Sequence, residues 1–92
     1  MQKILIADDE AKIRRIIRDF LTAKGFETVE AEDGAQALHV FAENSDIALA
    51  VLDIMMPEMN GWEVCRKIRE TSDVPVIFLT ARGEEFDELA CF

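Results

Sequence analysis

The sequence contains little cysteine and no long apolar segment. Two of its 92 residues are cysteines, Cys65 and Cys91, and neither lies in a CxxC motif or beside a cluster of metal ligands. We therefore expect two small core or surface residues and no disulfide. No apolar run approaches the roughly 20 residues that span a bilayer, and the first residues lack a signal-peptide pattern. These absences predict a cytoplasmic protein without a membrane partner.

Positive charge is also scarce. The chain has 19 acidic and 10 basic residues, which gives a formal net charge of -9. Such a segment repels phosphate backbones, so we expect no direct binding to nucleic acid. Hydrophobic residues make up 50% of the chain and charged residues 32%, a globular composition that suits one small domain. Repeats, linkers and low-complexity segments are absent.

Four short apolar runs indicate β-strands. Residues 3–7 and 47–52 are nearly continuous runs, which is typical of central parallel strands covered on both faces. Residues 27–31 alternate in polarity like a half-exposed edge strand, and residues 76–79 form the fourth run.

The segments between these runs have helical spacing. Residues 13–21 place apolar side chains on one face, and Gly25 ends that helix. Asp33 with Gln36, and Asn60 with Glu63, have the spacing of capping boxes that begin a second and a third helix. Acidic residues between 84 and 88 predict the start of a fourth helix. The alternation of strands and helices predicts an α/β fold with a parallel sheet.

Three of the predicted strands end on oxygen-bearing side chains. Asp8 and Asp9 follow the first strand, Asp53 follows the third, and Thr80 follows the fourth. In open α/β sheets, ligands bind at the carboxyl ends of the strands. Three carboxylates without histidine or cysteine favour Mg²⁺ or Mn²⁺ over Zn²⁺. Such a cation recruits phosphate, so that an aspartate can attack phosphorus and form an acyl phosphate.

Other candidate residues fit a structural role better. His39 has polar neighbours and no partner ligand, so we expect a surface residue. The methionines at 55, 56 and 59 suit gap-filling in the turn and core better than a soft-metal site. The exposed face of the first helix carries a basic strip, which is either solvated or a docking surface for an acidic partner. Its residues are Lys12, Arg14, Arg15, Arg18 and Lys24.

Taken together, the motifs resemble the receiver domains of bacterial two-component response regulators. The family's acidic pair matches Asp8 and Asp9, its D-x-x-M-P-x-M-x-G motif matches residues 53–61, and its T-A pair matches Thr80 and Ala81. The resemblance covers all 92 residues and implies a flavodoxin-like sheet of strand order 2-1-3-4. It also implies a sensor histidine kinase or phosphotransfer domain as partner.

The resemblance further implies a role for each matching residue. Asp53 is the expected phosphoryl acceptor. Asp9, Asp53 and the backbone carbonyl of Met55 are expected to bind Mg²⁺ directly, and Asp8 through water. Thr80 is expected to bond a phosphoryl oxygen after transfer and act as a switch, while the small Ala81 leaves the phosphate accessible. Beyond its own phosphorylation and dephosphorylation, no enzyme activity is expected.

The sequence departs from the family pattern at its carboxyl end. Receivers continue through a fifth strand and helix, with a lysine after the fifth strand that pairs with the phosphoryl group. Residues 1–92 are therefore interpreted as a receiver that is incomplete at its carboxyl end, whose phosphorylation could be impaired. Without a fifth strand, residues 76–79 form an unprotected apolar edge and one sheet face is uncovered, which predicts self-association through that edge and the fourth helix.

Two other functions stay open at this point. A protein of the same fold could serve as an interaction module without being phosphorylated. A magnesium-dependent aspartyl-phosphate hydrolase also uses an aspartate at a strand end, but it needs a second acid two residues later, where this chain has Met55.

Overall fold

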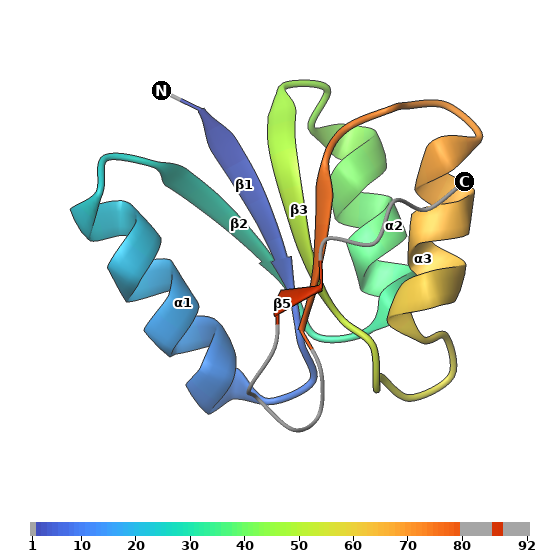
Figure 1. The fold of residues 1–92 in the computed structure, drawn as a ribbon, viewed down its shortest axis with the longest axis horizontal. Helices are drawn as coiled ribbons and strands as arrows, with labels where there is room; N and C mark the ends of the chain where they lie inside the picture. The colour runs from blue at the N-terminus through green and yellow to red at the C-terminus, as the bar shows by residue number, and fades with distance from the viewer. Residues whose placement is uncertain (1, 80–85, 88–92) are drawn as a thin grey trace.

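The computed structural model describes residues 2–79 and 86–87. Strands and helices alternate along most of this part of the chain (Figure 1). The strands are β1 (Lys3–Ala7), β2 (Glu27–Ala31), β3 (Ile47–Asp53), β4 (Val76–Leu79) and β5 (Phe86–Asp87), and the helices are α1 (Ala11–Ala23), α2 (Gly34–Glu43) and α3 (Gly61–Arg69).

The strands form one sheet in the order β2-β1-β3-β4-β5. The first four strands are parallel, as the sequence predicts. Helix α1 lies on one face of the sheet, while α2 and α3 lie on the other (Figure 1). The predicted α/β fold with strand order 2-1-3-4 is therefore confirmed.

The two faces of the sheet bury unequal cores. The face under α2 and α3 includes the fully buried side chains of Leu5, Leu52 and Phe78. The face under α1 has a smaller cluster around Ile4, Ile6 and Val51. Burying a side chain of this size contributes about 1.5–3 kcal/mol, so most of the stabilisation comes from the α2 and α3 side.

The two predicted capping boxes form to different extents. Asn60 accepts a hydrogen bond from the Glu63 N–H, and the Glu63 side chain accepts one from the Asn60 N–H, which completes the box at α3. At α2 the Asp33 carboxylate accepts from the Gln36 N–H, but the Gln36 side chain accepts from the Glu32 N–H instead of from Asp33. The capping box at α2 is therefore only half formed.

A two-residue strand that the sequence did not predict extends the sheet beyond β4. Phe86 and Asp87 pair antiparallel with β4, with Leu79 opposite Phe86 and Phe78 opposite Asp87. The fourth helix predicted to begin between 84 and 88 therefore does not include these two residues; the other residues of that segment lie outside the described part. Pairing with an unprotected strand edge satisfies backbone groups that a short acidic helix would leave uncovered. The edge of β4 is thus paired at its carboxyl half.

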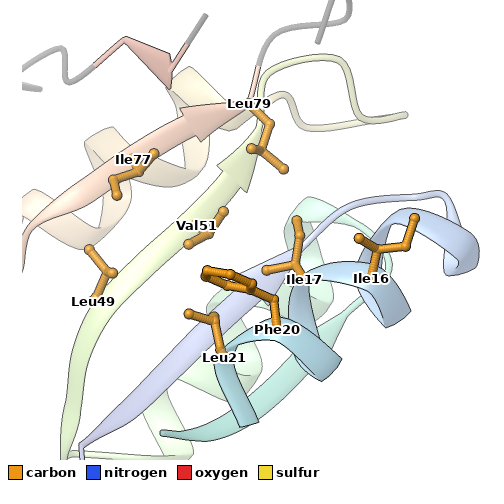
Figure 2. Close-up of a pocket in the computed structure, with 8 residues that line it drawn as sticks. All are labelled: Ile16, Ile17, Phe20, Leu21, Leu49, Val51, Ile77 and Leu79. Atoms are coloured by element: carbon orange, nitrogen blue, oxygen red, sulfur yellow. The ribbon is translucent and has the colours of Figure 1, made fainter. Parts of the chain in front are cut away.

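An apolar groove of about 410 Å³ lies between α1 and the sheet (Figure 2). Phe20 and Ile16 on its α1 side are 61% and 60% exposed. The other lining residues are Ile17 and Leu21 from α1, Leu49 and Val51 from β3, and Ile77 and Leu79 from β4. The groove lies on the α1 face of the sheet, and the uncovered face expected from the sequence stays a prediction.

Candidate functional site

The acidic residues are brought together by the register of the two central strands. Ala7, the last residue of β1, is paired with Leu52 of β3. Asp8 directly follows β1 and Asp53 is the last residue of β3, so the two acids lie side by side at this end of the sheet. Because both strands are parallel, their carboxyl ends lie at the same edge of the sheet.

Asp8, Asp9 and Asp53 form one cluster at this edge. Each contributes a carboxylate oxygen, and these oxygens all lie within 4.8 Å of one another. Asp8 and Asp53 are only 5% and 9% exposed, whereas Asp9 is exposed. The structure therefore brings the acids together at the strand ends, as predicted. Two of the carboxylates are buried and the third faces solvent.

Local backbone N–H groups orient the two buried carboxylates. The Glu10 N–H donates to Asp8 Oδ1 at 2.8 Å, and the Met55 N–H donates to Asp53 Oδ1 at 3.1 Å. Each bond closes a short turn two residues after the acid, which is the usual local bonding of aspartate. One oxygen of each carboxylate is thereby fixed by its own loop.

Burial and mutual repulsion disfavour ionisation of the buried pair. The pKa of Asp53 is raised to about 6; desolvation is the main cause and the nearby charges of Asp8 and Asp9 contribute, while the Met55 N–H opposes the shift. Desolvation also raises the pKa of Asp8, opposed by the Glu10 N–H. The cluster therefore has a carboxyl group that titrates close to neutral pH, as expected where a cation is needed to relieve repulsion.

The loop that follows Asp53 is anchored to the sheet and to α3. The Ile54 N–H donates to the Leu79 carbonyl at 3.1 Å, and the Gly61 N–H donates to the Ile54 carbonyl at 3.1 Å. Within the loop Glu58 has a φ of 68°, a conformation that non-glycine residues seldom adopt. These bonds hold Met55, whose backbone is expected to bind the cation, beside the Asp53 carboxylate.

Glycine is required where α3 begins. A Cβ on Gly61 would lie 2.5 Å from the Asp53 carbonyl oxygen. The amino end of α3 is thus packed directly against the strand end that carries Asp53. The spacing from Asp53 to Gly61 in the motif follows from this contact.

Other residues that the sequence singles out are not part of the acidic cluster as the structure describes it. His39 is exposed and pairs with Glu43 at 3.2 Å, so its expected surface position is confirmed. Thr80 and Ala81 lie outside the described residues, although the preceding Leu79 is paired with Asp53 in the sheet. Cys65 is buried in the core, and Cys91 lies outside the described residues, so the absence of a disulfide stays a prediction.

The basic strip of α1 differs from the prediction at two of its members. Arg14 and Arg18 both form ion pairs with Glu30 of β2, each at 3.3 Å, and are only partly exposed. Lys12, Arg15 and Lys24 are exposed. The sequence contains a hint of this, because Arg14 lies next to the apolar stripe and Glu30 lies within a strand. Two arginines therefore serve the contact between α1 and β2.

The donor set of the cluster fits a hard divalent cation. It offers carboxylate oxygens and a nearby main chain, and within the described residues the cluster contains no histidine or cysteine. Mg²⁺ and Mn²⁺ prefer such oxygen ligands, and Mg²⁺ commonly uses only one or two carboxylates together with water. The residues present therefore fit Mg²⁺ without any change of side chain.

The fold and the acidic cluster define an open α/β protein with three carboxylates gathered at the ends of its central strands. Residues 4–92 match the sequence profile of the response regulator receiver domain. The chain belongs to this family, whose members act in two-component signalling.

Curated relatives of the chain are transcriptional regulators. It is 49% identical over 88 residues to the probable transcriptional regulator ycf27 of Pyropia yezoensis, covering 96% of this chain and 36% of the relative. It is 46% identical over 90 residues to the transcriptional regulatory protein ResD of Bacillus subtilis (strain 168), covering 98% of this chain and 37% of the relative. The chain thus spans about a third of the length of these relatives.

Solved receiver structures have the same fold. The response regulator protein TrrA from Thermotoga maritima, in complex with Mg²⁺-BeF, aligns with a TM-score of 0.83 at 40% identity, covering 88% of this chain and 70% of that chain. A response regulator receiver domain protein from Clostridium thermocellum aligns with a TM-score of 0.82 at 33% identity, covering 87% of this chain and 65% of that chain.

No helix among the described residues is long and apolar enough to span a bilayer.

Proposed function

We propose that this chain is a phosphorylation-controlled receiver in which Asp53 accepts a phosphoryl group from a sensor histidine kinase. The observation that carries the proposal is the cluster of Asp8, Asp9 and Asp53, whose carboxylate oxygens lie within 4.8 Å of one another. The relative from Thermotoga maritima was solved with Mg²⁺-BeF, which supports a cation and a phosphoryl-like group in this family.

The proposed cation site uses the chain's own oxygen atoms. Asp9, Asp53 and the backbone carbonyl of Met55 would hold Mg²⁺ or Mn²⁺ directly, and Asp8 would act through water. A bound cation would supply positive charge that offsets the charge on the phosphoryl oxygens.

The chemical step that we propose is nucleophilic attack by Asp53. The Met55 N–H holds Oδ1 of Asp53, so we assign the attack on phosphorus to Oδ2. As the new O–P bond forms, the N–P bond of the donor phosphohistidine breaks, and its electron pair returns to the imidazole nitrogen. Asp53 must be ionised for this step. We assign Thr80 to a bond with a phosphoryl oxygen after transfer, and Ala81 to leaving room for the phosphate.

Fluorescence of Trp62 provides a test of both parts of the proposal. Trp62 is the single tryptophan of the chain, lies at the start of α3 and stacks on Phe78 at a centroid distance of 4.4 Å. We expect Mg²⁺ to change its emission, and acetyl phosphate or beryllofluoride to change it further. In Asp53→Asn the second response should be lost.

Other outcomes of the same titration would identify a different function. A response to Mg²⁺ in the wild-type chain without any response to either phosphoryl reagent would favour an interaction module that is not phosphorylated. Repeated turnover of a phosphate ester would indicate a hydrolase, although Met55 stands where that chemistry needs an acid.

A further inference from the structure

The side chain of Arg14 connects the acidic cluster to the edge strand β2. Its Nη1 donates to the backbone carbonyl of Asp8 at 2.6 Å, and its Nε donates to Glu30 Oε1 at 3.3 Å. The side chain is only 15% exposed. A single guanidinium group therefore bonds both to β2 and to the main chain of the loop that carries Asp8 and Asp9.

The main chain around Asp8 is fixed at several points. The Asp8 N–H donates to the Ala31 carbonyl at 3.1 Å, and the Asp8 carboxylate accepts from the Glu10 N–H. The Asp8 carbonyl belongs to the peptide unit that joins Asp8 to Asp9. Because a peptide unit is planar, holding this carbonyl also sets the direction in which the backbone enters Asp9.

Asp9 depends on this support more than the other two acids. Its side chain is exposed, whereas Asp8 and Asp53 are buried and held by backbone N–H groups. An exposed carboxylate has many rotamers available, so a fixed backbone restricts where it can lie. The bond from Arg14 to the Asp8 carbonyl is one of the contacts that fix this backbone.

We infer that Arg14 is a positioning residue for the cation site, which sets the place of Asp9 through the Asp8–Asp9 peptide unit. This inference rests on the proposed function, because it concerns the same Mg²⁺ site. Arg14 also brings a positive charge near the cluster, which by itself opposes binding of a cation. Removing the arginine therefore has opposite effects on Mg²⁺ affinity: loss of positioning weakens it, and loss of charge strengthens it.

The sign of the change in Mg²⁺ affinity decides between these two effects. Arg14→Gln should weaken Mg²⁺ binding, measured by calorimetry or Trp62 fluorescence, by about tenfold, as expected for a residue that supports metal ligands without touching the metal. Arg18→Gln is the matched control, because Arg18 also pairs with Glu30 and carries the same charge. Arg18 has no hydrogen bond to Asp8 in the part of the chain that the structure describes. Arg18→Gln should leave the affinity unchanged or slightly stronger.

Two further variants separate geometry from charge and from folding. Arg14→Lys keeps the charge, but an ammonium group cannot reproduce the rigid guanidinium fork that bonds to Glu30 and Asp8 together. We expect Mg²⁺ affinity to stay several-fold below wild type; full recovery by lysine would overturn the positioning role. Glu30→Gln keeps Arg14 and should cause a smaller loss. Urea unfolding without Mg²⁺ establishes that each variant is folded, and the lysine and Glu30 variants decide the matter if Arg14→Gln does not fold.

The failure of this inference is distinguishable from failure of the proposed function. If the wild-type chain binds Mg²⁺ and Arg14→Gln binds it as well as Arg18→Gln does, the positioning role is wrong and the proposed function stands. If the wild-type chain does not bind Mg²⁺, both are overturned.

Discussion

Replacing Asp53 with asparagine should make the metal-free protein more stable at neutral pH. The structure raises the pKa of Asp53 from 3.8 to about 6, mainly through desolvation. Each pKa unit corresponds to about 1.4 kcal/mol, so ionising Asp53 costs the folded state up to about 3 kcal/mol relative to the unfolded chain. An amide carries no charge and avoids this cost, while its oxygen can still accept the Met55 N–H.

The sign of the pH dependence follows from the same shift. Between pH 4 and about 6 the folded protein holds a proton on Asp53 that the unfolded chain has already released. The stability that this proton contributes is complete below pH 4 and is lost as pH rises through about 6. The advantage of Asp53→Asn should therefore be about 1 kcal/mol near pH 4.5 and reach its full size, about 2–3 kcal/mol, near pH 7.5.

Urea unfolding followed by Trp62 fluorescence in a chelator measures this difference. Asp73→Asn is the matched control, because Asp73 is exposed and the substitution removes the same charge. Adding Mg²⁺ should stabilise the wild type more than Asp53→Asn, since a ligand stabilises the folded form in proportion to its affinity and the variant has lost one proposed carboxylate ligand. An Asp53→Asn variant no more stable than wild type at pH 7.5, or an advantage that does not depend on pH, would refute the reasoning.

Three other predictions address binding and association. Mg²⁺ affinity should fall as pH drops below about 6, because Asp53 must be ionised to bind the cation; equal Mg²⁺ affinity at pH 5 and pH 7.5 would contradict this. Reversing Lys12 and Arg15 to Glu should slow phosphoryl transfer from the kinase but not from acetyl phosphate, because exposed charge mainly steers a protein partner; equal slowing with both donors would remove docking as the explanation. The predicted self-association should give a mass above that of one chain in light scattering during size exclusion, and a compact monomer at micromolar concentration would refute it. A lower mass in Phe20→Gln would place the interface at the apolar groove. An unchanged oligomer would leave the unpaired part of the β4 edge as the interface.

The sequence predicts the arrangement of the four parallel strands because that arrangement depends on short-range patterns. Continuous apolar runs in β1 and β3 identify buried strands, and the acids that follow them lie at one edge once the strands are parallel. The cluster of Asp8, Asp9 and Asp53 could therefore be predicted before any coordinates were known.

The features that the sequence did not predict depend on contacts between distant segments. Phe86 and Asp87 lie among acids that suit a helix start, but pairing with β4 determines their conformation. Arg14 and Glu30 are separated along the chain, and only the packing of α1 beside β2 brings them together. Gln36 has the spacing of a capping box, yet its side chain bonds to Glu32, a choice that the spacing alone does not determine.

The three glycines among the described residues are required for two different physical reasons. Gly25 has a φ of 94° and open space around it, so its backbone conformation is what matters. At Gly61 and Gly34 it is space that matters, since a Cβ would lie 2.5 Å from the carbonyl oxygen of Asp53 and of Met59 respectively.

The lack of space for a side chain at Gly61 affects how loss-of-function variants are interpreted. Alanine at Gly61 keeps every acid of the site and changes no charge, yet it must displace the strand end that carries Asp53. Such a variant would lose signalling with its full set of chemical groups in place. A screen that scores only the acidic residues would therefore miss a position on which their geometry depends.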